Sequence, residues 1–185
     1  MPDIRSAAFR TQPFPITVNG VELMFPTLPA ARWLEAFGSP TFHMSVILMM
    51  DVEQRDPLLD ALSSGRLSVE DVVQKLAHTA LAEAAGRPWW EAWKLMSSVV
   101  NQDNGGRLLG SLVLSGVDAE RITLAAWCSA VWALITRNAD TTELMKMEMQ
   151  LQMPPPGEEA DGWDDVEDFS VTAARLRSMP GVSVG

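Results

Sequence analysis

Residues 118–137 of the chain read DAERITLAAWCSAVWALITR, and this stretch has the clearest helical pattern in the sequence. Its apolar residues recur at the spacing i, i+3, i+4, i+7, i+10 and i+11: Leu124, Trp127, Cys128, Val131, Leu134 and Ile135. This spacing places all of them on one face of an α-helix. We therefore predict a helix that is capped by Asp118, ends near Arg137 and buries one face in a helical core.

Segments on both sides of this stretch also have helical patterns. Asp140 and Glu143 form a capping box that begins a methionine-rich helix running to Met153. Upstream, Gly86 ends one predicted helix and Pro88 begins the next, because glycine and proline favour these two positions. The other predicted helices cover residues 29–37, 39–50, 56–62, 68–85 and 108–115, although residues 112–114 also fit an extended strand.

A short β-hairpin is predicted before the first of these helices. Asn19-Gly20 separates two β-prone runs, and both residues accept the positive φ that a two-residue hairpin turn requires. Residues 1–13 are polar and unpatterned, which predicts a flexible N-terminal arm. The expected fold is therefore mostly α, a compact multi-helix domain over residues 14–153 with an N-terminal hairpin at about 16–25.

The composition changes after this domain. The sequence Pro154-Pro155-Pro156-Gly157 cannot continue a helix. Seven acidic residues and no basic residue then lie between Glu158 and Asp168. Such a segment buries too little apolar surface to order itself, so we predict a flexible acidic tail over residues 154–185.

Charge and hydropathy exclude several classes of function. A net charge of −10 and an isoelectric point near 4.6 argue against nucleic acid, because phosphate recognition requires clustered Lys and Arg. The apolar run Met44–Met50 is too short to span a membrane, and the first ten residues lack the apolar segment of a signal peptide. We expect a soluble intracellular protein that binds neither nucleic acid nor membrane.

The residues available for catalysis are few. The chain has two histidines and one cysteine. We expect His43 to pack within an apolar helix, His78 to lie on the polar side of another, and Cys128 to be a small buried side chain without nucleophilic character. The acidic run lacks the order of ligands and the central glycine of an EF-hand. We therefore predict no catalytic residue, no cofactor and no metal site.

Tryptophan and methionine are the strongest candidates for binding a partner. Trp89, Trp90 and Trp93 are too close in sequence for one helix face to bury all three, and exposed aromatic side chains often anchor interfaces. Met145, Met147 and Met149 alternate at spacing two, so on a helix they point in different directions. Flexible methionines adapt to varied partners. The alternative for both groups is packing in the core.

Several of these segments together resemble a known family. Gly86-Arg87-Pro88-Trp89-Trp90, a glycine-bounded segment at 108–116, the 118–127 stretch and Leu151-Gln152-Met153-Pro154-Pro155 resemble the tail assembly chaperones of long-tailed (siphovirus-type) actinobacterial phages. The likeness covers residues 27–157 and does not include the hairpin.

The resemblance implies a specific function. Proteins of this family are non-enzymatic, mostly helical and found in the host cytoplasm, where they bind the tape measure protein while tail tube protein polymerises around it. The family also implies a longer product made by ribosomal frameshifting, for which the codons of residues 154–157 are the predicted place. Alternatives are a structural virion protein, such as a head–tail connector or minor tail protein, and a small acidic regulatory adaptor. Self-association is left open.

Removal of residues 157–185 tests the predicted tail. We expect the truncated chain to unfold cooperatively, with a free energy of unfolding within about 0.5 kcal/mol of the full chain, because an acidic tail adds little buried surface. Thermal and urea denaturation measure this. A large loss of stability would instead mean that Phe169 or Leu176 packs on the helical domain.

Overall fold

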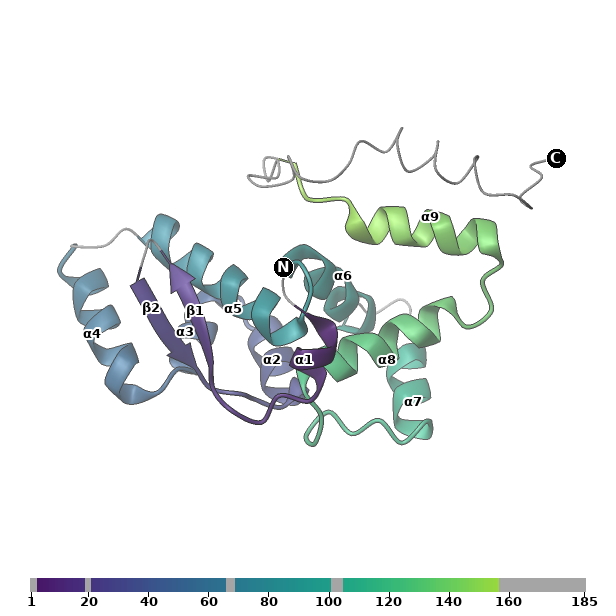
Figure 1. Ribbon diagram of the computed structural model, residues 1–185, viewed down its shortest axis with the longest axis horizontal. Coiled ribbons are helices and arrows are strands. Elements are labelled where there is room, and N and C mark those ends of the chain that lie inside the picture. The colour runs from purple at the N-terminus through teal and green to yellow at the C-terminus, as the bar shows by residue number, and fades with distance from the viewer. Residues whose placement is uncertain (1–2, 19–20, 66–68, 101–104, 157–185) are drawn as a thin grey trace. The chain divides into compact units, whose positions relative to one another are not determined.

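Helices dominate the part of the chain that the structure, a computed structural model, describes: residues 3–18, 21–65, 69–100 and 105–156 (Figure 1). The chain divides into two compact units, Met1–Gln152 and Met153–Gly185. The predicted acidic tail lies outside the described residues from position 157 onward. The mostly-α class with a small N-terminal hairpin is confirmed.

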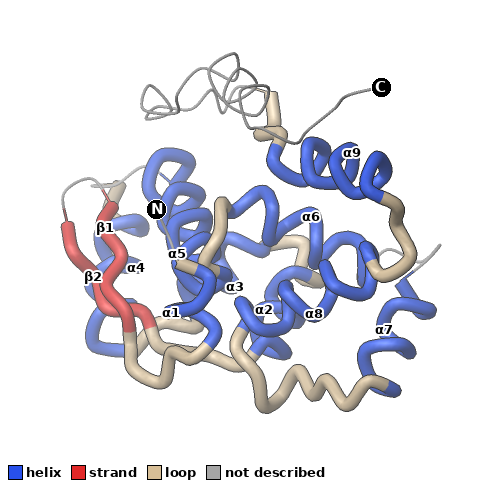
Figure 2. The backbone as a smooth tube through the Cα atoms, turned by 45° about the vertical axis from the view of Figure 1, so that its right-hand side comes forward, coloured by secondary structure: helices blue, strands red, loops and turns tan. Residues whose placement is uncertain are grey.

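The described elements all belong to the first unit. They are α1 (Ile4–Ala8), β1 (Phe14–Val18), β2 (Val21–Phe25), α2 (Ala30–Phe37), α3 (Phe42–Leu48), α4 (Val52–Ser63), the π-helical segment η1 (Val69–Gln74), α5 (Lys75–Ala85), α6 (Trp89–Val100), α7 (Gly105–Leu114), α8 (Leu124–Thr136) and α9 (Thr141–Gln152). Figure 2 shows the same elements by type, with the hairpin at one side of the helices.

The hairpin predicted from two β-prone runs forms. β1 and β2 pair antiparallel with Val18 opposite Val21, while Asn19 and Gly20 lie outside the described residues. Phe14, Ile16 and Val18 are buried, and the two side chains between them are exposed. β1 begins earlier than predicted, so Pro15 lies within it. A two-stranded sheet tolerates this proline because an edge strand does not need every N–H for pairing.

Helix α5 is the element around which the others pack. Seven of its eleven residues are buried: Leu76, Ala77, His78, Ala80, Leu81, Ala84 and Ala85. It contacts α1, β1, α3, η1, α6 and α8. Alanine side chains let neighbouring backbones approach closely, so a single short helix can be covered on several sides. The hairpin meets α5 through β1, and its β2 edge is tied to α4 because Met24 N–H donates to Gln54 Oε1 (2.8 Å).

The helix predicted from residue 118 begins six residues later. Thr123 is the N-cap of α8, and its Oγ1 accepts from the Ala126 N–H. The preceding residues serve α2 instead: the carbonyls of Ala119 and Ile122 accept from the first two N–H groups of α2 at 3.0 and 2.8 Å. These N–H groups have no partner inside their own helix, so the turn at residues 119–121 before α8 is held in place by capping α2. The expected cap at Asp118 is wrong for this reason.

The apolar stripe of α8 lies in the core as predicted. Leu124, Trp127, Cys128 and Val131 are buried, and the last two members of the stripe are partly buried against the same core. Trp33 of α2 is also fully buried, with its ring 5.5 Å from that of Phe25.

The structure also differs from the predicted N-terminal arm. Residues Ile4–Ala8 form α1, which Asp3 caps by accepting from the N–H groups of Arg5 and Ser6. Ala7 is buried, and the Ala8 carbonyl accepts from Thr123 Oγ1 at 3.0 Å. Ala7 is the buried residue of this short helix, so the segment shows no repeating apolar pattern from which a helix could be predicted.

Four other helices begin differently from the sequence prediction. α7 begins at Gly105 rather than residue 108, and residues 112–114, which also fitted a strand, are helical. α4 begins at Val52 rather than residue 56 and continues through Pro57. α3 begins at Phe42, two residues after Pro40. The helix predicted from residue 68 is π-helical over Val69–Gln74 before α5 begins, and Ser68 lies outside the described residues.

Gly86 offers a test of how closely α1 packs. It ends α5 with φ of 64°, and a Cβ there would lie 2.6 Å from the Ile4 Cα and 2.9 Å from the Ala7 Cβ. Gly65 has a similar φ of 69° but nothing within 4 Å. We expect Gly86→Ala to destabilise the fold by about 1–3 kcal/mol more than Gly65→Ala, because the shared backbone strain cancels and overpacking remains. Urea denaturation measures both; equal losses would contradict the close contact.

Candidate partner-binding surface

Two of the three candidate tryptophans on α6 contact aromatic rings of other helices. The Trp89 ring stacks on the His78 ring with 3.7 Å between centroids and 12° between planes. Trp93 makes edge-to-face contacts with Phe37 (4.6 Å) and Phe42 (5.0 Å). Both tryptophans are half-buried. Their large contact area therefore serves mainly to join α6 to α2, α3 and α5.

Trp90 is also half-buried, and its indole N–H has a partner within the chain. Trp90 Nε1 donates to the Gln152 carbonyl at 3.1 Å. One turn further along α6, Lys94 Nζ donates to the carbonyls of Gln150 (2.7 Å) and Leu151 (3.1 Å). The last carbonyls of a helix lack partners within it and carry partial negative charge, so a lysine and an indole N–H stabilise this end. Trp90 thus holds the C-terminus of α9, and partner contact by Trp90 stays a prediction.

The start of α9 is held by the predicted capping box. Asp140 Oδ1 accepts from the N–H groups of Thr142 and Glu143, each at 2.9 Å. In return, Glu143 Oε2 accepts from the Asp140 N–H at 3.2 Å. This reciprocal arrangement satisfies the orphan donors of the first turn. Both ends of α9 are therefore fixed by hydrogen bonds.

The methionines of α9 lie on different sides of the helix. Within α9, which the structure describes in full, no side chain is buried. Met147 is half-buried, as are Leu144 and Leu151 at spacings of three and four residues from it. Met145 and Met149, one turn apart, are 63% and 62% exposed. We call these two residues the methionine face of α9.

A second exposed apolar surface lies on α7 and was not anticipated from the sequence. Leu109, Val113 and Leu114, the α7 face, are 50%, 65% and 90% exposed. A groove of about 330 Å³ adjoins them; it is lined by Leu34, Leu109, Leu112, Val113, Gly116, Val117, Asp118, Ala119 and Trp127. The run of apolar residues at 108–114 exceeds what one helix face can bury. The same reasoning that selected the tryptophans would therefore have found this surface.

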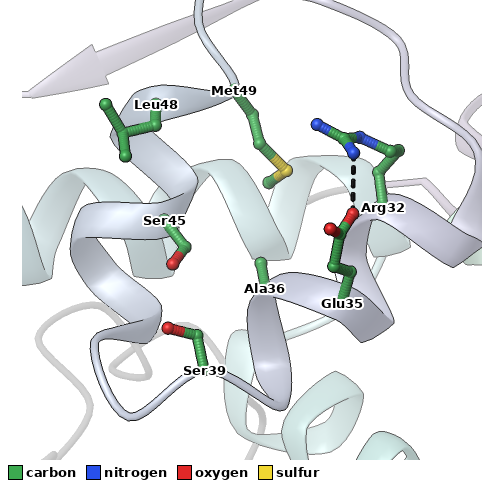
Figure 3. A pocket seen from close by; sticks show the side chains of 7 residues that line it. All are labelled: Arg32, Glu35, Ala36, Ser39, Ser45, Leu48 and Met49. Atoms are coloured by element: carbon green, nitrogen blue, oxygen red, sulfur yellow. Dashed lines mark hydrogen bonds and ion pairs between the residues drawn. The ribbon is translucent and has the colours of Figure 1, made fainter.

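A pocket of about 330 Å³ lies between α2 and α3 (Figure 3). Its lining mixes apolar and polar side chains: Arg32, Glu35, Ala36, Ser39, Ser45, Leu48 and Met49. The two charged side chains pair with each other, with 2.7 Å between Arg32 Nη1 and Glu35 Oε2. The Ser39 hydroxyl lies 3.1 Å from the Thr41 hydroxyl. No histidine or cysteine is among the lining residues, so neither serine has an imidazole base within the pocket.

The histidines and the cysteine are placed as follows. His43 of α3 and His78 of α5 lie together, with 3.3 Å between their Nε2 atoms. The predicted polar-side position of His78 is wrong, since α5 is covered on that side by α3 and α6 and the residue is buried. Burial lowers the pKa of both histidines, that of His78 to about 4 with His43 contributing. Burial raises the pKa of the Cys128 thiol to about 12, so this predicted core residue is a poor nucleophile.

Metal-ligating groups and membrane-spanning helices were also sought among the described residues. Among the residues that the structure describes, no group of three or more His, Cys, Asp or Glu side chains is placed to hold a metal ion. None of the helices in that part of the chain combines the length and apolar composition needed to cross a membrane.

Comparison of the chain with protein-family models, with curated proteins and with solved structures found no match. The resemblance to tail assembly chaperones therefore stays a prediction.

Lys94→Met tests whether α6 holds α9. The substitution keeps the length of the side chain and removes the ammonium group that donates to two carbonyls. A hydrogen bond that involves a charged group contributes about 1.5–3 kcal/mol to stability. We expect the amides of α9 to exchange with solvent at least about tenfold faster, while the rest of the unit is unchanged. Hydrogen exchange resolved by residue measures this.

Lys146→Met is the matched control, because Lys146 is an exposed lysine on α9 itself. It removes the same charge without touching the contact between α6 and α9. Equal protection of α9 in the two variants would contradict an anchoring role for Lys94.

Proposed function

We propose that this protein is a non-enzymatic tail assembly chaperone, which binds apolar helical segments of a phage tape measure protein while tail tube protein polymerises. The observation that carries the proposal is the exposure of the side chains of α9. This helix has no buried side chain and presents Met145 and Met149 to solvent. A surface of this kind suits a binding protein better than an enzyme.

The physics of short helices supports a binding role for α9. Isolated helices of twelve residues are marginal in water, and most helical stability in proteins comes from packing of an apolar face. In α9 the hydrogen bonds at the two ends supply part of that stability, while the methionine face remains uncovered. A client helix packed on this face would remove apolar surface of both partners from water, at about 25 cal/mol per Å².

The chemistry of methionine fits a long and varied client. Its unbranched, polarisable side chain changes shape at little cost, so one surface can accept different apolar residues in turn. The α7 face offers a second apolar contact, and Figure 1 shows α7 and α9 on different sides of α8. Two separate contacts would let one protein cover more than one turn of an extended helical client.

Co-expression with the tape measure protein of the same phage tests the proposal. We expect the native chain to keep the client soluble and the double variant Met145→Gln/Met149→Gln to weaken binding at least about tenfold, a loss of about 1.4 kcal/mol. Glutamine is close to methionine in length and is a good helix former, so α9 should remain helical. Soluble client is measured by sedimentation, and affinity with purified proteins.

Met24→Gln is the control, because Met24 is an exposed methionine outside α9, on β2. It should leave client solubility unchanged. Equal solubility of the client with and without this protein would contradict the proposal. Recovery of the protein at fixed copy number from purified particles would also contradict it and would favour a structural virion protein instead.

A further inference from the structure

The side of α7 that points away from the core is apolar and uncovered. Among the described elements, α7 packs chiefly on α6 and α8, and Figure 2 shows it at the edge of the helices, away from the hairpin. Leu112 is buried, whereas Leu109, Val113 and Leu114, the α7 face, are exposed to solvent. Large apolar side chains that are grouped on a surface commonly mark a contact with another molecule.

This surface has both a projection and a recess. Leu114, at the C-terminal end of α7, is 90% exposed. The groove described above adjoins the α7 face, and Leu109, Val113 and Gly116 are among the residues that line it. A contact between two copies related by a twofold axis brings one patch against itself, so the patch must offer both shapes. The α7 face therefore fits a second copy of this chain.

The distribution of charge also favours a second copy. The chain has a net charge of −10, so two copies repel each other over most of their surface. Arg107 is the only charged residue of α7, and it is exposed. Residues 108–117 contain no charged residue, and the next one is Asp118, which lines the groove. Two α7 helices can therefore meet without bringing acidic side chains together.

An antiparallel arrangement of two α7 helices pairs opposite charges at both ends. Arg107 lies near the start of α7 and Asp118 lies beyond its end, so each faces the other residue of the second copy when the helices run in opposite directions. Asp118 is positioned by the Glu120 N–H, which donates to its Oδ1 at 3.0 Å. Its ion pair with Arg121 (3.2 Å) is exposed to solvent. Exposed pairs contribute little to stability, so Asp118 can exchange partners.

We propose that two copies of this chain associate through their α7 faces, with the two helices antiparallel about a twofold axis. Gly106 and Gly110 lie on the exposed side of α7, and a Cβ at either position would meet nothing within 4 Å. Glycine disfavours a helix, and packing within the chain does not require it at these two positions. In the dimer, the bare backbone lets Leu114 of the second copy lie close to the helix.

The size of the contact makes this dimer weak. α7 has ten residues and is about 15 Å long, so the contact buries less than the roughly 1,200 Å² at which stable interfaces begin. We expect a dissociation constant of about 10–100 µM. Dimer formation does not depend on client binding, although a client helix that uses the α7 face would displace the second copy.

Sedimentation equilibrium of the full chain at low ionic strength tests the dimer. We expect the average mass to rise with concentration toward that of two chains. Leu114→Gln should raise the dissociation constant at least about tenfold. The fold should be unaffected, because this side chain is almost fully exposed.

Leu48→Gln is the matched control, because Leu48 is an exposed leucine on α3, outside the α7 face. It should leave the dissociation constant unchanged. Equal weakening by the two substitutions would overturn the proposal, as would a native chain that stays monomeric up to about 1 mM.

Reversal of the two charges tests the antiparallel arrangement. Arg107→Asp and Asp118→Lys each place like charges opposite one another in a dimer of one variant, so each variant alone should dissociate about tenfold more readily. An equal mixture of the two variants restores two pairs of opposite charge, and the mixed dimer should form about as tightly as the native one. Failure of the mixture to associate would overturn the proposal. A native chain that is monomeric alone and binds a client helix through Leu114 would also overturn it, because the α7 face would then belong to the client.

Discussion

The close packing around α5 is the constraint on which the rest of this structure depends. Its alanines allow β1, α1, α3, α6 and α8 to approach one short helix. Gly86 extends this to the end of the helix, because its missing Cβ is the space that α1 occupies and its positive φ turns the chain toward α6. A helix with larger side chains would keep these elements apart, and the two histidines and the tryptophans would not meet.

The helices are less buried with each step away from α5, from α6 to α9. Stacking of Trp89 on His78 and the contacts of Trp93 fix α6 against the core. Lys94 and Trp90 then hold the C-terminus of α9 through its carbonyls rather than through apolar contacts. The outermost helix is thereby positioned while its methionine face stays uncovered. Local opening usually begins where few apolar contacts are buried, so α9, which has no buried side chain, is expected to open before the helices of the core.

Local chemistry was sufficient to predict those elements whose ends depend on neighbouring residues. The capping box at Asp140 and Glu143, the end of a helix at Gly86 and the short hairpin each depend on residues close in sequence, and each is confirmed. The start of α8 could not be predicted, because the residues before Thr123 are held by the N-terminus of α2. α1 was missed because its docking depends on Gly86, far away in sequence.

For the candidate sites, the sequence by itself determined which residue types were in excess: more tryptophans and methionines than one helix face can bury. It could not assign them, because helical periodicity says which side chains share a face and not what covers that face. Only the tertiary structure decided that Trp90 faces α9, that Met145 and Met149 face solvent, and that His43 and His78 meet. The physical reason is that each of these outcomes depends on packing between elements far apart in the chain.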